Sequence, residues 1–350
     1  MGSEMCIRDR DLVVLDWIEI LEKIKSHATS EAGREAISLM KPLATQEQAY
    51  TSFQEIADAT VVLNQGVRPF MQSLDLYSTW IGRLKKNAVL KTLELKDVRG
   101  FCMEALALKE ALHPIENDWS QRISRSLFDA EEPLSAIDQV ITGSGDIRSD
   151  ASQTLYNLFK EKERLAREIQ STLDRLVKDH QMETVIQDKY VTTRDGRWVL
   201  PVKSGMQSRL PGVIHGSSQS KQTVFVEPEK VIPTNNRLRQ VEAEIEDEIE
   251  RLLTELSRYL SSQSSEIESA RVLLEEADLR FSQAQFTNLV QGHPIEFSKD
   301  AMELIEVRHP LLQLAGKKVV SNTVLLEDRK SILLLSGPNA GGKTVLLKSI

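Results

Sequence analysis

The sequence has little cysteine, few aromatic residues and no long apolar run. Its two cysteines, Cys6 and Cys102, lack CxxC spacing, so neither a zinc centre nor a disulfide-rich fold is expected. Aromatic residues make up 5% of the chain, which disfavours a compact β-sandwich. No run of about 18 apolar residues exists, which excludes a transmembrane helix. We therefore expect a cytoplasmic protein with no membrane partner.

The chain also lacks the positive charge of a protein whose whole surface binds nucleic acid. Its 350 residues include 52 acidic and 44 basic side chains, which gives a net charge of −8. Any contact with a phosphate backbone must therefore be local. Hydrophobic residues make up 41% and charged residues 27%, as is typical of a globular protein with a sizeable core.

Hydrophobic periodicity predicts a mainly helical N-terminal region. Residues 1–10 have neither a helical nor a strand pattern, and we interpret them as non-native or unstructured. Asp16 followed by Glu19, and Thr45 followed by Gln48, have the spacing of two capping boxes, and each predicts a helix start. This region is expected to form a helical core.

Two long stretches without proline or glycine carry apolar residues at steps of three, four and seven. They cover residues 149–183 and 235–290 and predict long helices with coiled-coil-like packing. The segment between them is rich in Val, Thr, Gly and Pro, and it predicts short strands with a tight hairpin turn at Asp195 and Gly196. If the two helices are antiparallel neighbours, this β-rich module lies at their far end.

The predicted fold is multidomain and mainly α, with a small β-rich tip module and the start of an α/β P-loop ATPase domain. The predicted divisions are a non-native or unstructured N-terminus at 1–10, a helical core at 11–148, a first long lever helix at 149–184, a β-rich basic tip or clamp-like module at 185–232, a second long helix returning to the core at 233–292, and the N-terminal part of the ATPase domain at 293–350.

Charge is distributed unevenly between these parts. Residues 189–221 hold six basic side chains and one acidic side chain, a net charge of +5, whereas residues 240–280 hold twelve acids and four arginines, a net charge of −8. A basic module beside an acidic helix is typical of contact with a phosphate backbone. A solvated hairpin face without a partner would show the same pattern. The candidate nucleic-acid contacts are Arg194, Arg197, Lys203, Arg209 and Lys221.

Residues 337–344 carry the strongest chemical signal. The apolar run 331–336 is typical of a buried parallel strand and leads into G-x-x-x-x-G-K-[ST], the Walker A loop. The glycines let backbone amides approach phosphate oxygens, the lysine contacts the β- and γ-phosphates, and the threonine hydroxyl binds Mg²⁺. ATP and Mg²⁺ are therefore the expected cofactors. The predicted nucleotide-binding residues are Gly337, Pro338, Asn339, Ala340, Gly341, Gly342, Lys343 and Thr344, with Thr344 as the Mg²⁺ ligand.

The loop resembles the Walker A loop of the MutS family of DNA-repair ATPases. Arg308-His309-Pro310 resembles the tripeptide that opens that family's ATPase domain, and Val319-Val320 resembles its adenine-side segment. The segments 194–203, 211–215 and 225–228 are similar to the second bacterial branch, the MutS-two endonucleases. The resemblance covers about residues 11–350.

By this resemblance the full-length protein would be an ATPase and endonuclease that forms a homodimer, binds branched DNA such as recombination junctions and suppresses homologous recombination. The same resemblance implies an alternative, a sensor of collided ribosomes that binds ribosomal RNA and splits stalled ribosomes. We expect the Walker B acid and the Smr nuclease domain to lie beyond Ile350. No catalytic residue is therefore assigned, and the chain alone is expected to be inactive.

Two further classes of protein are weighed. A coiled-coil chromosome-maintenance ATPase of the SMC or RecN kind is disfavoured, because those proteins place Walker A ahead of the coiled coil. A scaffold without enzymatic activity would fail to bind ATP.

Overall fold

A computed structural model describes most of the chain and confirms that it is mainly helical. The described residues are 12, 14–298, 301–316, 319–327, 332–338 and 342–350. The segment 1–10, interpreted as non-native, lies outside them. Contacts divide the chain into two compact units. Unit 1 holds the chain up to Ala88 together with Asp97–Ser135 and Leu260–Ile350, and unit 2 holds Val89–Lys96 and Ala136–Tyr259. The six predicted divisions stay a prediction.

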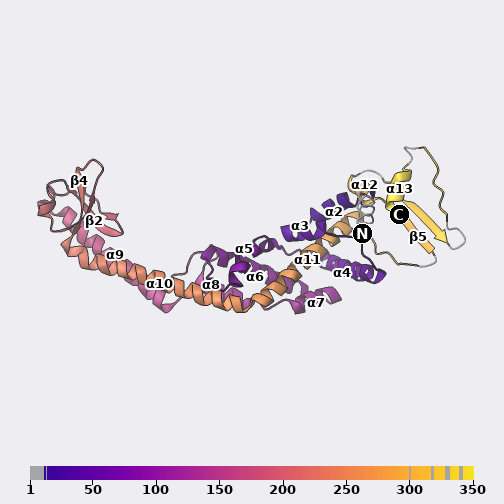
Figure 1. The fold of residues 1–350 in the computed structure, drawn as a ribbon, viewed down its shortest axis with the longest axis horizontal. Helices are drawn as coiled ribbons and strands as arrows, with labels where there is room; N and C mark the ends of the chain where they lie inside the picture. Colours follow the sequence, from indigo (N-terminus) through magenta and orange to yellow (C-terminus); the bar gives the residue numbers. More distant parts are fainter. Residues whose placement is uncertain (1–11, 13, 299–300, 317–318, 328–331, 339–341) are drawn as a thin grey trace. The chain divides into compact units, whose positions relative to one another are not determined.

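Unit 1 is a helical assembly around helix α11, Ser264–Val290 (Figure 1). Helices α2, α3, α4, α7 and α12 all contact α11. The buried residues of α11 include Ile267, Leu274 and Phe281, which recur every seven residues and give one apolar face. The other elements of this region are α2 (Trp17–Lys25), α3 (Glu31–Ser38), α4 (Gln46–Asn64), η1 (Gln72–Leu76), α5 (Tyr77–Leu84), α6 (Thr92–Leu112), α7 (Asp118–Ser126), α8 (Glu131–Val140), α12 (Pro310–Leu314) and α13 (Lys343–Ser349), of which α6 and α8 continue into unit 2.

The two predicted capping boxes have different outcomes. Thr45 accepts a hydrogen bond from the backbone amide of Gln48 and begins α4, as predicted. Asp16 does precede α2, but its backbone is left-handed, with φ 57° and ψ 23°, and its side chain does not cap the helix. The capping prediction at Asp16 is wrong because the carboxylate is bound elsewhere in the unit.

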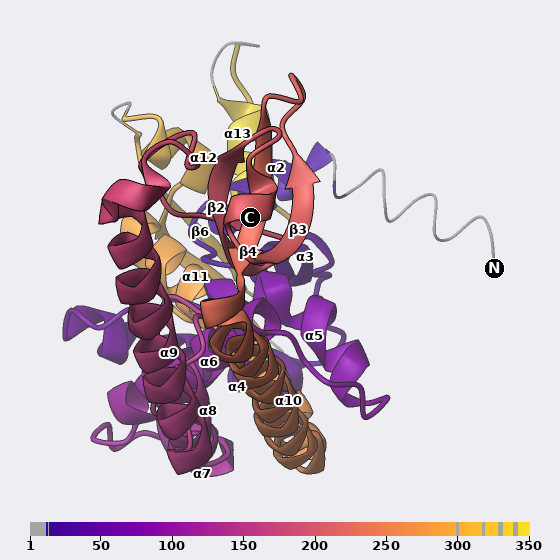
Figure 2. The same ribbon diagram turned by 90° about the vertical axis from the view of Figure 1, so that its left-hand side faces the viewer.

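Unit 2 pairs helix α9, Gln153–Lys178, with helix α10, Ile232–Ser262, whose last residues belong to unit 1. Arg237 bonds Glu161 at 2.9 Å, while Ser152 at the start of α9 bonds Glu248, further along α10, at 2.6 Å. The helices are therefore antiparallel, and Figure 2 shows them side by side. Their predicted apolar stripes are largely buried, and the buried members are Leu155, Leu165, Ile169, Leu173, Leu176, Leu238, Val241, Ile245, Leu252, Leu256 and Leu260.

A four-stranded antiparallel sheet joins α9 to α10, as the β-rich pattern predicts. Its order is β1-β2-β4-β3. The hairpin turn is confirmed, because Asp195 and Gly196 have φ values of 50° and 74°, as a type I′ turn requires. The strands are β1 (Thr192–Arg194), β2 (Arg197–Lys203), β3 (Gly212–Ser217) and β4 (Thr223–Pro228).

The predicted single helix over 235–290 is two helices. Helix α10 ends at Ser262 and α11 begins at Ser264, with Gln263 between them at φ −95° and ψ 9°. The residues around the break read Ser-Ser-Gln-Ser-Ser, and serine competes for backbone hydrogen bonds inside a helix. The Ser261 hydroxyl donates to the carbonyl oxygen of Leu84 at the end of α5, outside its own helix. The apolar stripe alone did not reveal this interruption.

The C-terminal part of unit 1 contains a two-stranded antiparallel ribbon that the sequence analysis did not predict. Strand β5, Ala301–Val307, pairs with β6, Asn322–Glu327, in register from Ala301 opposite Glu327. The short helix α12 lies between them in the chain. Several apolar side chains of this part remain open to solvent, including Ile305 at 71% exposure.

Candidate functional site

The phosphate-binding loop leads directly into helix α13, as predicted. Gly342 is the N-cap of this helix, with φ 80°, and Gly337 at the start of the loop has φ 144°. Residues with a Cβ rarely adopt such angles, so both positions suit glycine. Residues 339–341 of the predicted site lie outside the described residues. The described ends of the loop therefore have the backbone freedom that phosphate binding needs.

Lys343 connects the two ends of the loop. Its Nζ atom donates a hydrogen bond to the carbonyl oxygen of Gly337. An ammonium group has three donors, so this bond leaves others for an anion. Thr344 follows in the first turn of α13, and its side chain is exposed. A flexible cation at the loop and an exposed hydroxyl beside it fit a nucleoside triphosphate with Mg²⁺.

The apolar run before the loop is not a buried strand. Ile332 to Ser336 have no regular secondary structure, and Ile332 and Leu334 are 87% and 86% exposed. This prediction is wrong for the described part of the run, and Ser331 lies outside it. A parallel strand is stable when neighbouring strands bond it and helices cover both faces. Among the described residues none pairs with this segment.

The predicted adenine-side residues lie just before β6. Val320 is 76% exposed, so its aliphatic surface is free to receive a ring, and its carbonyl oxygen accepts a hydrogen bond from Asn322. Val319 is half-buried. Their contact with adenine stays a prediction.

A polar cluster that the sequence analysis did not predict lies at the C-terminal end of helix α13, whose N-terminus follows from the loop. The Asp16 carboxylate is 2.6 Å from Lys348 Nζ, near the end of α13, and 3.4 Å from His309 Nε2, before α12. These residues are up to 332 positions apart in the chain. No local pattern links them, and the spacing of Asp16 to Glu19 indicated a helix cap instead. His309 is buried, with 4% of its surface exposed.

The basic residues of the sheet fall into two groups. Arg197 donates to Glu227 at 2.9 Å and to Asn236 at 2.8 Å, so it is part of the framework of unit 2. Arg194 is exposed and lies over the Phe225 ring at 4.1 Å, which is a cation–π contact. The remaining candidates are Lys203, which is half-buried, and Arg209 and Lys221, which are exposed and form no ion pair with any residue that the structure describes.

Glu227 organises the interior of this sheet. Its carboxylate is buried and accepts from His215 Nε2 at 2.6 Å, Arg197 Nη1 at 2.9 Å and Asn235 Nδ2 at 2.8 Å. These donors come from β3, β2 and α10. A buried carboxylate needs such donors to offset its desolvation. His215 therefore has a structural role in this sheet.

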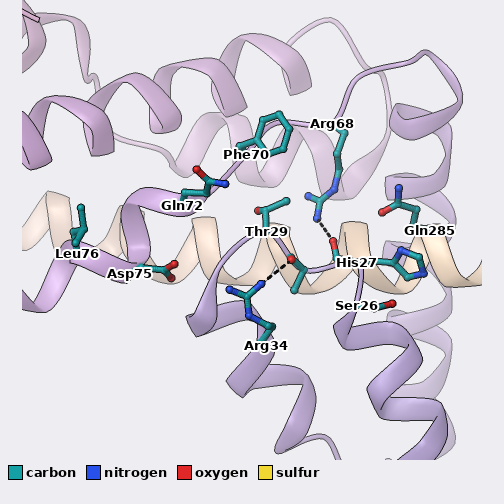
Figure 3. Close-up of a pocket in the computed structure, with 11 residues that line it drawn as sticks. Ser26, His27, Thr29, Arg34, Arg68, Phe70, Gln72, Asp75, Leu76 and Gln285 are labelled. Carbon is teal, nitrogen blue, oxygen red and sulfur yellow. Dashed lines mark hydrogen bonds between the residues drawn. The ribbon is translucent and has the colours of Figure 1, made fainter.

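An open pocket of about 820 Å³ lies in unit 1 beside the segment that links α2 to α3 (Figure 3). Arg34 and Arg68 line it, and each donates to a backbone carbonyl, that of Ala28 or His27, at 3.1 Å. Arg68 also forms an ion pair with buried Asp278 at 2.8 Å. Burial lowers the pKa of the Arg68 guanidinium, while the hydrogen bond that the guanidinium donates to Asp278 opposes this lowering. Both arginines therefore make structural contacts with other residues of unit 1.

Neither a redox site nor a metal site emerges in the described part of the chain. Cys102 is buried, and its burial raises the pKa of the thiol to about 12, so the thiol stays protonated. No group of three or more His, Cys, Asp or Glu residues in the described ranges is arranged to hold a metal ion. None of the described helices is both long enough and apolar enough to span a membrane.

Comparison with known proteins gives consistent relatives. The chain is 30% identical over 352 residues to Endonuclease MutS2 of Aquifex aeolicus, covering 98% of this chain and 45% of that protein. It is 29% identical to Endonuclease MutS2 of Alkaliphilus oremlandii and 27% identical to that of Bacillus velezensis, in each case over 98% of this chain and 44% of the relative. No protein-family model matches.

These matches first define the class, since the chain is homologous to MutS-family proteins along nearly all of its length. Within this class the relatives are named Endonuclease MutS2, and the similarity extends over about 98% of this chain, which supports its assignment to the N-terminal MutS2 region. The chain spans less than half the length of the curated relatives it matches. The resemblance carried by the loop, the Arg-His-Pro tripeptide and the sheet segments is thereby confirmed.

Proposed function

We propose that the chain is the helical and nucleotide-binding portion of a MutS2-type protein that binds ATP with Mg²⁺ and contacts branched DNA through the sheet of unit 2. The observation that carries the proposal is the Walker A octad, whose last two residues begin helix α13 and whose Lys343 bonds back to Gly337. The relatives named as endonucleases support the branch.

The sheet of unit 2 supports the nucleic-acid part of the proposal. Its basic residues lie on a protein whose net charge is −8, so the positive charge is local. Arg209 and Lys221 are exposed, and Arg194 has an exposed guanidinium stacked on a ring. We leave Arg197 out of the phosphate contacts because its guanidinium is paired with Glu227. We assign phosphate contact to Arg194, Arg209 and Lys221, with half-buried Lys203 at the margin.

Nuclease activity is assigned to the whole protein and to no described residue. The names of the relatives carry this activity. The described residues offer no metal-binding cluster of the kind that many nucleases use. The chain therefore contributes recognition and nucleotide binding in this proposal.

The direct test is a binding comparison between a four-way DNA junction and a linear duplex of the same length and composition. We expect the chain to bind the junction more tightly, because a branch presents phosphate backbones from several directions to a small basic surface. Equal affinity for the two DNAs would contradict the proposal. Preference for collided ribosomes over junctions in a competition assay would instead favour a translational role.

The residues of the interface are tested by salt dependence. Arg209→Ala combined with Lys221→Ala should weaken junction binding and reduce the slope of log K against log salt by about 2, because each lost phosphate contact removes about 0.9. The matched control is Lys41→Ala combined with Lys86→Ala, two exposed lysines of unit 1. The slope should not change in the control. An unchanged slope in the first variant would exclude these two residues from the interface.

A further inference from the structure

We propose that Asp16 is a positioning residue for nucleotide binding, which fixes helix α13, and with it the phosphate-binding loop, against helices α2 and α12. The inference rests on the proposed function, because it requires that the loop bind ATP. Asp16, His309 and Lys348 all belong to unit 1. The proposal assigns a role in the site to an acidic residue more than 300 positions away from it in the chain.

The conformation of Asp16 directs its carboxylate away from helix α2 and toward Lys348 and His309. Aspartate before a helix ordinarily accepts hydrogen bonds from the first amides of that helix. Here the residue has φ 57° and makes no side-chain cap. A left-handed backbone is unfavourable for residues with a Cβ, although aspartate tolerates it better than most. The carboxylate instead lies between Lys348 and His309.

Lys348 links Asp16 to helix α13, which begins at the phosphate-binding loop. Helix α13 has 7 residues, and so short a helix depends on tertiary contacts for its position. Lys343 at its first position bonds back to Gly337, and Lys348 in its last turn bonds Asp16 at 2.6 Å. The side chains of Lys348 and Asp16 are 24% and 21% exposed, so water screens this pair less than a surface pair.

His309 Nε2 lies 3.4 Å from the same carboxylate, which places Asp16 beside the start of helix α12. Its side chain is buried, and Pro310 after it is the first residue of α12, which packs on α2 and α11. An open cavity of about 420 Å³ remains between α2 and α12, so apolar packing there is incomplete. The polar contacts of Asp16 therefore connect α2 with α12 and α13.

A helix that is already fixed in position should bind phosphate with higher affinity than one that must be ordered on binding. If α13 is free to shift, ATP binding must also order the helix, and that entropy is subtracted from the affinity. Removing the charge of Asp16 should thus weaken ATP binding without removing any group that touches ATP. Removing the charge of Lys348 should have the same effect, because either change breaks the pair.

The experiment measures the dissociation constant of a fluorescent ATP analogue with Mg²⁺ for the 350-residue chain. Asp16→Asn and Lys348→Gln should each raise it about fivefold, the effect of one partly exposed ion pair. The double variant Asp16→Lys with Lys348→Asp should bind more tightly than Asp16→Lys alone, because it rebuilds the pair with reversed charges. Glu19→Gln, an exposed acid on α2, is the matched control and should bind as the parent does.

The outcomes separate this inference from the proposed function. If the parent binds ATP and Asp16→Asn binds equally well, the positioning role is wrong while the loop assignment stands. If Asp16→Asn weakens binding and the charge reversal restores nothing, the ion pair is not the cause and the inference fails. A parent that does not bind ATP refutes the proposed function itself. Thermal melts by circular dichroism establish that each variant compared is folded.

Discussion

Asp278→Ala is expected to lower the free energy of unfolding of unit 1 by about 3–5 kcal/mol, because it removes one partner of a buried ion pair. Asp278 is fully buried on α11. Its carboxylate accepts from the backbone amides and hydroxyls of Thr29 and Ser30 and from Arg68, at distances of 2.7–3.1 Å. The substitution would leave Arg68 and four further donors, all buried or partly buried, without their acceptor.

The substitution also disturbs the join between α2 and α3. Thr29 and Ser30 form the connection between these helices, and Ser30 caps α3 by accepting from Gly33. A Cβ at Gly33 would lie 2.2 Å from Asp278 Oδ2, so the carboxylate occupies space that only glycine leaves free. The aspartate therefore holds α2, α3 and the Arg68 segment onto α11 at once.

The measurement is urea unfolding of the chain followed by circular dichroism. Asp278→Asn keeps the shape and one acceptor oxygen, so its loss should fall between those of the parent and the alanine variant. Asp247→Ala, an exposed residue of α10, is the control and should change stability by less than about 0.5 kcal/mol. A loss below about 1 kcal/mol for Asp278→Ala would show that the network contributes little.

Local features of this fold were predictable because their causes are local. The hairpin at Asp195 and Gly196 follows from residues that tolerate positive φ, and the cap at Thr45 needs only a partner three residues ahead. The long apolar stripes predicted helices because burial of one face repeats with the helical period. The break at Gln263 was not predicted because the apolar stripe continues on both sides of the serine-rich segment.

Contacts between distant segments were not predictable from one sequence. Asp278 reaches Thr29 across 249 positions, and neither residue stands out among its neighbours. Arg197 was a candidate phosphate contact because positive charge can be counted in a sequence. A sequence does not reveal that the buried carboxylate of Glu227 lies beside this arginine in the fold. The run 331–336 read as a buried strand because its composition is apolar, but burial depends on other segments covering it.

The Walker A octad differs from these long-range contacts, because its residue types alone predict which ligand it binds. Glycines at fixed positions, one lysine and one threonine are what a triphosphate and Mg²⁺ require. The described ends of the loop agree with that requirement in backbone angle and in the reach of Lys343. A substitution at this lysine is therefore the sharpest test of the nucleotide assignment.

Lys343→Ala is expected to weaken ATP binding by on the order of 100-fold or more, because it removes a charge-assisted donor to the β- and γ-phosphates. Helix content should not change, since among the described residues the Lys343 side chain bonds only the nearby Gly337 carbonyl. The assay is titration with a fluorescent ATP analogue in the presence of Mg²⁺. Lys86→Ala removes one exposed positive charge elsewhere in unit 1 and should bind as the parent does. Chelation of Mg²⁺ should weaken binding to the parent and, to a smaller extent, to Thr344→Val, because the hydroxyl that links metal to protein is already gone. If Lys343→Ala and the parent bind ATP equally, the lysine does not contact the phosphates and the nucleotide assignment of this loop is wrong.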